Sequence, residues 1–158
     1  MQISELNDME AVFGLRQLTR NVDTDIDLAD EARVRAFVES AAGRALAGPD
    51  EVQAFLALFE RPDAAASVAR ACLASVQEQP TLLEDQADEL PSILENPPRT
   101  QQMDMGLSLG LLALAGMAMF LSGSLKVKTK DFELEYQGNE NVVKIFKALL
   151  PRIPGWRS

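Results

Sequence analysis

Residues 105–125 read MGLSLGLLALAGMAMFLSGSL and form a run of 21 consecutive positions without a charged side chain. As a helix that rises about 1.5 Å per residue, this run would span about 30 Å, which is the thickness of the hydrocarbon core of a bilayer. The run also contains four glycines and three serines and has no flanking Trp or Tyr, so it equally suits a helix buried in a protein core or an oligomer. We expect a transmembrane helix here and keep the buried helix as the alternative.

Small residues recur along one face of this run. Gly106 and Gly110 are four positions apart, and Ala113 continues the same face. Such a spacing of small residues allows two helix backbones to approach closely in lipid. We therefore predict that Gly106, Gly110 and Ala113 form a helix–helix contact, through which the chain associates with a second copy of itself.

Residues 1–95 have the pattern of a bundle of four or five amphipathic helices. Apolar residues recur at steps of three and four, which is typical of helices that bury one face. Gly48 and Pro49 separate two of these helices, because Gly suits the position after a helix and Pro suits the first turn of the next. Pro91 should stop the last helix. Residues 96–104 then form a linker.

The charges are distributed unevenly along the chain. Residues 1–104 carry 20 acidic and 8 basic side chains, whereas residues 105–158 carry 4 acidic and 7 basic ones. The acidic part is a poor match for nucleic acid, because binding phosphates requires clustered Lys and Arg, and we expect no nucleic-acid partner. Lys126, Lys128 and Lys130 follow the apolar run directly, and we predict that these lysines flank the membrane.

The sequence that follows the apolar run alternates between apolar and polar residues. Residues 125–138 read LKVKTKDFELEYQG, with Leu125 and Val127 on one face. This period of two predicts a β-hairpin, which we expect to be covered by a helix over residues 139–150. Residues 126–158 would then form a small ββα module.

The predicted fold class is therefore mainly α, in four parts. The acidic helical bundle occupies residues 1–95, the linker 96–104, the hydrophobic helix 105–125 and the ββα module 126–158.

The composition gives little support to a catalytic centre. The chain contains no histidine, so the commonest general base and a common zinc ligand are missing. Cys72, the only cysteine, has apolar neighbours at helical spacing, which predicts a small buried side chain. Asp23, Asp25 and Asp27 begin like a calcium loop, but Leu28 stands where such a loop needs glycine. We expect no catalytic residue, no cofactor and no metal site.

Together these patterns predict a non-enzymatic protein at the cell membrane. In this hypothesis the bundle binds a protein partner, while the hydrophobic helix contacts lipid and forms a homo-oligomer. One alternative is a membrane-perturbing, pore-forming effector that inserts only on a trigger. Another is a cytoplasmic homo-oligomeric scaffold that has residues 105–125 as its shared core. An enzyme that depends on Cys72 or Asp23 is the most distant alternative.

Overall fold

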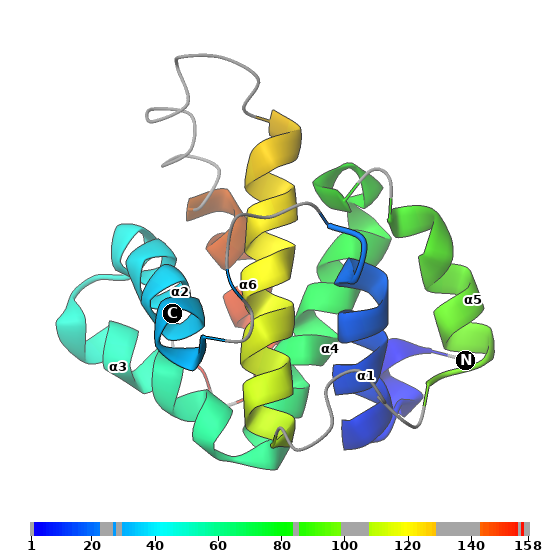
Figure 1. Ribbon diagram of the computed structural model, residues 1–158, viewed down its shortest axis with the longest axis horizontal. Helices are drawn as coiled ribbons and strands as arrows, with labels where there is room; N and C mark the ends of the chain where they lie inside the picture. The colour runs from blue at the N-terminus through cyan, green and yellow to red at the C-terminus, as the bar shows by residue number, and fades with distance from the viewer. Residues whose placement is uncertain are drawn as a thin grey trace.

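The computed structural model describes residues 2–22, 27, 30–83, 86–98, 108–128, 143–154 and 156, and these residues are mainly helical (Figure 1). The α-helices are α1 (Asp8–Thr19), α2 (Glu31–Ala45), α3 (Pro49–Ala57), α4 (Pro62–Glu78), α5 (Leu90–Glu95) and α6 (Leu109–Lys128). Short 3-10 helices are η1 (Ile3–Glu5), η2 (Leu58–Glu60), η3 (Pro80–Leu83), η4 (Ala87–Glu89) and η6 (Leu150–Arg152). Residues 143–149 form a further helix. The predicted helical bundle is confirmed.

The hydrophobic helix α6 lies at the centre of the bundle and packs against α1, α2 and α4 (Figure 1). Its side chains Met117, Phe120 and Leu121 are completely buried. A helix that is apolar on all sides needs cover all round, and here the cover comes from the apolar faces of the chain's own amphipathic helices. The described parts of the predicted bundle, hydrophobic helix and C-terminal module share this one core.

Glycines in α6 allow neighbouring segments to approach its backbone closely. A Cβ atom at Gly110 would overlap the carbonyl oxygen of Phe59. A Cβ atom at Gly116 would lie 2.9 Å from the side chain of Leu15. Real Cβ atoms do not make contacts this short, so the packing around α6 depends on the absence of these side chains.

Local signals explain where several helices begin. At the start of α1 the Glu10 N–H donates to Asn7 Oδ1 over 2.8 Å, and the Asn7 N–H donates to Glu10 Oε1 over 2.9 Å. This reciprocal pair is a capping box. Pro49 and Pro62 occupy the first turns of α3 and α4, where a missing N–H leaves no hydrogen bond unmade. The predicted boundary at Gly48 and Pro49 is therefore confirmed.

The prediction of a transmembrane helix is wrong. Within the part of the chain that the structure describes, no helix is both long enough and apolar enough to cross a membrane. The helix begins at Leu109, four residues after the apolar run starts, and its last turn carries lysines. Its uncharged part, residues 109–125, is about 25 Å long at about 1.5 Å per residue, which falls short of the roughly 30 Å of a bilayer core.

The predicted β-hairpin, and with it the ββα module, is also corrected. Residues 125–128, expected in the first strand, form the last turn of α6, and the described residues contain no strand. Extending an existing helix adds a hydrogen bond for each residue without a new nucleation cost, so the helix continues through this alternating segment. The rest of the predicted hairpin, residues 129–138, lies outside the described residues.

Pro91 starts a helix, contrary to the prediction that it stops one. It lies in the first turn of α5, where its missing N–H is tolerated. Before it, Pro80–Leu83 form η3 and Ala87–Glu89 form η4, in place of the expected regular helix.

We predict that Gly110→Ala lowers the free energy of unfolding by about 3 kcal/mol, because the added methyl group overpacks against the Phe59 backbone, which cannot rotate away. Gly43→Ala is the matched control, since a Cβ there would meet no atom within 4 Å. This variant should be more stable than the wild type by about 0.5–1 kcal/mol, through the higher helix propensity of alanine. Urea unfolding measures both changes. Equal stability of Gly110→Ala and the wild type would contradict the close packing.

Candidate functional site

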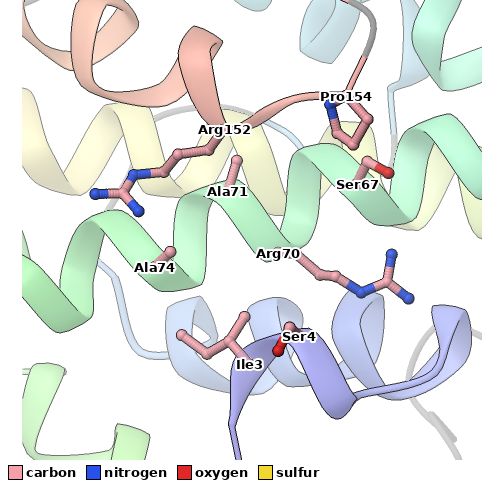
Figure 2. A pocket seen from close by; sticks show the side chains of 8 residues that line it. All are labelled: Ile3, Ser4, Ser67, Arg70, Ala71, Ala74, Arg152 and Pro154. Carbon is pink, nitrogen blue, oxygen red and sulfur yellow. The ribbon is translucent and has the colours of Figure 1, made fainter.

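A groove with a volume of about 370 Å³ lies between η1, α4 and the chain that follows η6 (Figure 2). Its walls therefore come from the two ends of the chain, and its floor comes from the middle. The lining residues are Ile3, Ser4, Ser67, Arg70, Ala71, Ala74, Arg152 and Pro154.

The floor of the groove is one face of α4. Ser67, Arg70, Ala71 and Ala74 follow one another at positions i, i+3, i+4 and i+7, so they share a face of the helix. Figure 2 shows Ala71 and Ala74 on α4 between the two end segments. Because alanine and serine side chains are short, the surface of α4 is low here, and a depression remains between the walls.

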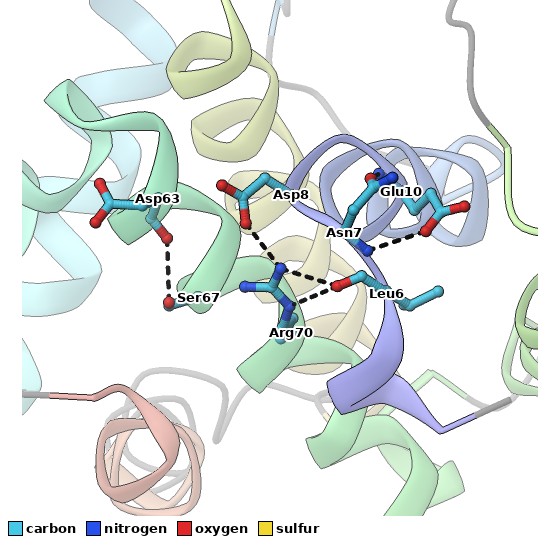
Figure 3. Close-up of polar contacts among 7 residues, drawn as sticks. All are labelled: Leu6, Asn7, Asp8, Glu10, Asp63, Ser67 and Arg70. Atoms are coloured by element: carbon cyan, nitrogen blue, oxygen red, sulfur yellow. Dashed lines mark hydrogen bonds and ion pairs between the residues drawn. The ribbon is translucent and has the colours of Figure 1, made fainter.

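Arg70 holds the N-terminal wall on α4. Its Nε and Nη2 atoms donate to the carbonyl oxygen of Leu6 over 3.2 and 2.9 Å, and Nη2 also donates to Asp8 Oδ1 over 2.8 Å (Figure 3). A guanidinium group can make such a fork of bonds because its donors lie in one rigid plane. This arginine therefore links η1 and the start of α1 to the middle of α4.

Arg152 has the corresponding role at the other wall. It forms an ion pair with Glu78, the last residue of α4. Its Nε atom is buried and has no hydrogen-bond acceptor among the described residues. Figure 2 shows that the side chains of Arg152 and Arg70 point toward opposite ends of the groove. Both walls are thus attached to the same helix by charged groups.

A second depression, of about 290 Å³, lies beside the connection between α2 and α3 and is lined in part by Trp156. The Trp156 ring is perpendicular to that of Phe55, with 6.0 Å between the centroids, and the Phe146 ring meets Phe55 in the same way at 5.3 Å. Such edge-to-face pairs stabilise a packed aromatic cluster. We interpret Trp156 as a residue that attaches the C-terminal segment to the core.

The structure places two of the three predicted helix–helix contact residues within the described chain. Gly110 faces the backbone of Phe59, and Ala113 is buried in the core. Gly106 lies outside the described residues. Both described residues therefore contact segments of their own chain, and the contact with a second copy stays a prediction.

The structure describes the backbone of two of the three predicted membrane-flanking lysines. Lys126 and Lys128 lie at the end of α6, and Lys130 lies outside the described residues. Their role beside a membrane stays a prediction.

Cys72 is buried, as predicted, on the inner side of α4. Its Sγ atom lies 3.4 Å from Met117 Sδ of α6. Burial raises the pKa of the Cys72 thiol well above its ordinary value, because the thiolate would lose its hydration. A protonated, enclosed thiol is a poor nucleophile. The other candidate, Asp23, lies outside the described residues, and the described residues contain no cluster of three or more potential metal ligands among His, Cys, Asp and Glu.

The sequence reasoning missed the groove. The spacing of Ser67, Ala71 and Ala74 could have indicated a low helix face, but alanine in a helix is also typical of simple helix formation. The opposing walls are separated from α4 by many residues, and no local pattern predicts that they meet.

No protein-family model matches the chain, and neither the curated proteins nor the solved structures include a significant match to it.

We predict that the Cys72 thiol makes stability depend on pH. The unfolded thiol ionises near pH 8.5, whereas the folded protein keeps it protonated, since burial raises its pKa. Below about pH 8 the thiol is protonated in both states and the free energy of unfolding is at its full value. As the pH rises further, the unfolded state is stabilised by ionisation of the thiol, and the free energy of unfolding falls. Between about pH 7.5 and about pH 9.5, the wild type should lose about 1.4 kcal/mol relative to Cys72→Ala. Urea unfolding of both proteins at each pH measures the difference, and parallel pH dependences would contradict the prediction.

Proposed function

We propose that this protein is a non-enzymatic helical interaction module that binds a protein partner in the groove between η1, α4 and the chain after η6. The observation that carries the proposal is that Arg70 and Arg152 attach both walls of this groove to one helix. A groove whose walls are already held in place does not have to be ordered on binding, so less conformational entropy is lost.

The composition of the groove favours a protein partner. Pro154 is exposed and Ala74 is partly exposed, the buried Ile3 and Ala71 lie at the bottom, and serine and arginine side chains complete the lining. An apolar centre with a polar rim is the common arrangement of protein–protein interfaces. A volume of about 370 Å³ can accept a large side chain of the partner together with its neighbours. In many protein interfaces a few such anchoring side chains provide most of the binding energy.

The two alternative functions require a larger change in the protein. Both the pore-forming effector and the scaffold with a shared core need α6 to leave the bundle. That step would expose completely buried side chains such as Phe120 and Leu121, at a cost of about 25 cal/mol for each Å² of apolar surface. The groove is open in the folded chain and needs no such step.

The proposal is tested by blocking the groove with a bulky side chain. Ser4 is exposed and lines the groove, so Ser4→Trp should fill the groove without disturbing the core. Ser40→Trp is the matched control, because Ser40 is also exposed but lies on α2. A displayed library of random peptides is selected on the wild-type protein, and the enriched peptides are then measured on both variants.

We expect enriched peptides that bind Ser40→Trp as tightly as the wild type and bind Ser4→Trp at least about tenfold more weakly, which corresponds to about 1.4 kcal/mol. Urea unfolding verifies that both variants fold. If no enriched peptide distinguishes the two variants, the groove is not a docking site and the proposal fails.

A further inference from the structure

The two ion pairs at the groove present their negative members to the outside. The Asp8 side chain is 45% exposed against 25% for its partner Arg70. The Glu78 side chain is 64% exposed against 31% for Arg152. Arg70 and Arg152 line the groove, whereas Asp8 and Glu78 lie beside its lining and are the more exposed members of pairs that have no net charge.

Two further carboxylates lie near the groove and add net negative charge. Glu5 is exposed and is adjacent in sequence to the lining residue Ser4. Asp63 is exposed and lies one helical turn before Ser67, whose Oγ donates to the Asp63 carbonyl oxygen over 3.1 Å. Neither carboxylate forms an ion pair with a described residue. Figure 3 shows Asp8 beside Arg70, and Asp63 one turn before Ser67 near the start of α4.

An exposed apolar side chain is adjacent in sequence to Asp8. Met9 follows Asp8 in the first turn of α1, and its side chain is 49% exposed. Methionine is flexible and polarizable, which suits adaptable contacts with a partner.

From this arrangement we infer that the partner segment is basic and amphipathic. Its apolar side chains occupy the floor at Ala71 and Ala74, while its Lys or Arg side chains lie over Glu5, Asp63 and the exposed carboxylates of the ion pairs. The net charge of −9 on the chain at pH 7 would also increase the rate at which a basic partner arrives. This inference rests on the proposed function and specifies the partner of the same groove.

The test uses two synthetic amphipathic helical peptides, both acetylated and amidated and carrying the same fluorescent label. One consists of Leu and Lys, and the other has Glu in place of every Lys. Fluorescence anisotropy measures their dissociation constants for the folded protein at low salt and at about 0.5 M NaCl. We expect the Leu/Lys peptide to bind at least about tenfold more tightly at low salt, and this preference should shrink at high salt. Ser4→Trp should weaken its binding about tenfold.

Asp63→Lys and Asp50→Lys form a matched pair of charge reversals. Both aspartates follow a proline in the first turn of a helix, so the two changes disturb the helix dipole equally. Only Asp63 is near the groove. Asp63→Lys should lower the affinity for the Leu/Lys peptide by at least about twofold, as expected for the loss of an exposed ion pair. Asp50→Lys should have a smaller effect, through net charge alone.

The possible failures are distinguishable. Tighter binding of the Leu/Glu peptide, lost in Ser4→Trp, would overturn the basic partner but leave the groove as a docking site. Equal effects of Asp63→Lys and Asp50→Lys would overturn the role of the carboxylates near the groove and leave only nonspecific attraction. Binding of both peptides that is unaffected by Ser4→Trp would overturn this inference, while the library selection still decides the proposed function independently.

Discussion

Burial of α6 on all its sides over residues 112–123 is the constraint from which the rest of the structure follows. No face of this helix is polar enough to be left in water, so α1, α2 and α4 each turn an apolar face toward it. The close approach of neighbouring segments at Gly110 and Gly116 completes the cover. Because the inner faces of the surrounding helices must cover α6, their charged groups are found mainly on the outside of the bundle. For the same reason the core extends from Ile3 to Ile153.

The two faces of α4 connect this core to the candidate site. Its inner face, which includes the buried Cys72, packs against α6. Its outer face has only small side chains at Ala71 and Ala74, and the two ends of the chain settle on either side of them. One helix thereby supports the fold and forms the floor of the groove. Cys72, the only cysteine of the chain, lies on the inner face of this helix and is therefore buried away from the open surface.

Electrostatics makes the groove different from an anion-binding cleft, although two arginines line it. Each guanidinium group is used to hold a wall in place, and its carboxylate partner is the more exposed member of the pair. Arginine is suited to this structural role, because its planar fork can bond a carbonyl and a carboxylate together, as Arg70 does with Leu6 and Asp8. The exposed carboxylates of Asp8 and Glu78 thus lie beside a groove whose lining includes both guanidinium groups.

The sequence by itself determined the helical character of the protein, the start of α3 at Pro49 and the burial of Cys72, because capping residues and hydrophobic spacing act over a few residues. It could not decide whether the apolar run lies in lipid or in protein, since both surroundings favour the same side chains. The alternating pattern of residues 125–128 predicted a β-strand, but these residues continue helix α6. Only the tertiary structure brought Ile3, Ala71 and Pro154 together in one groove, because contacts between distant segments depend on how whole helix faces pack and leave no local signal in the chain.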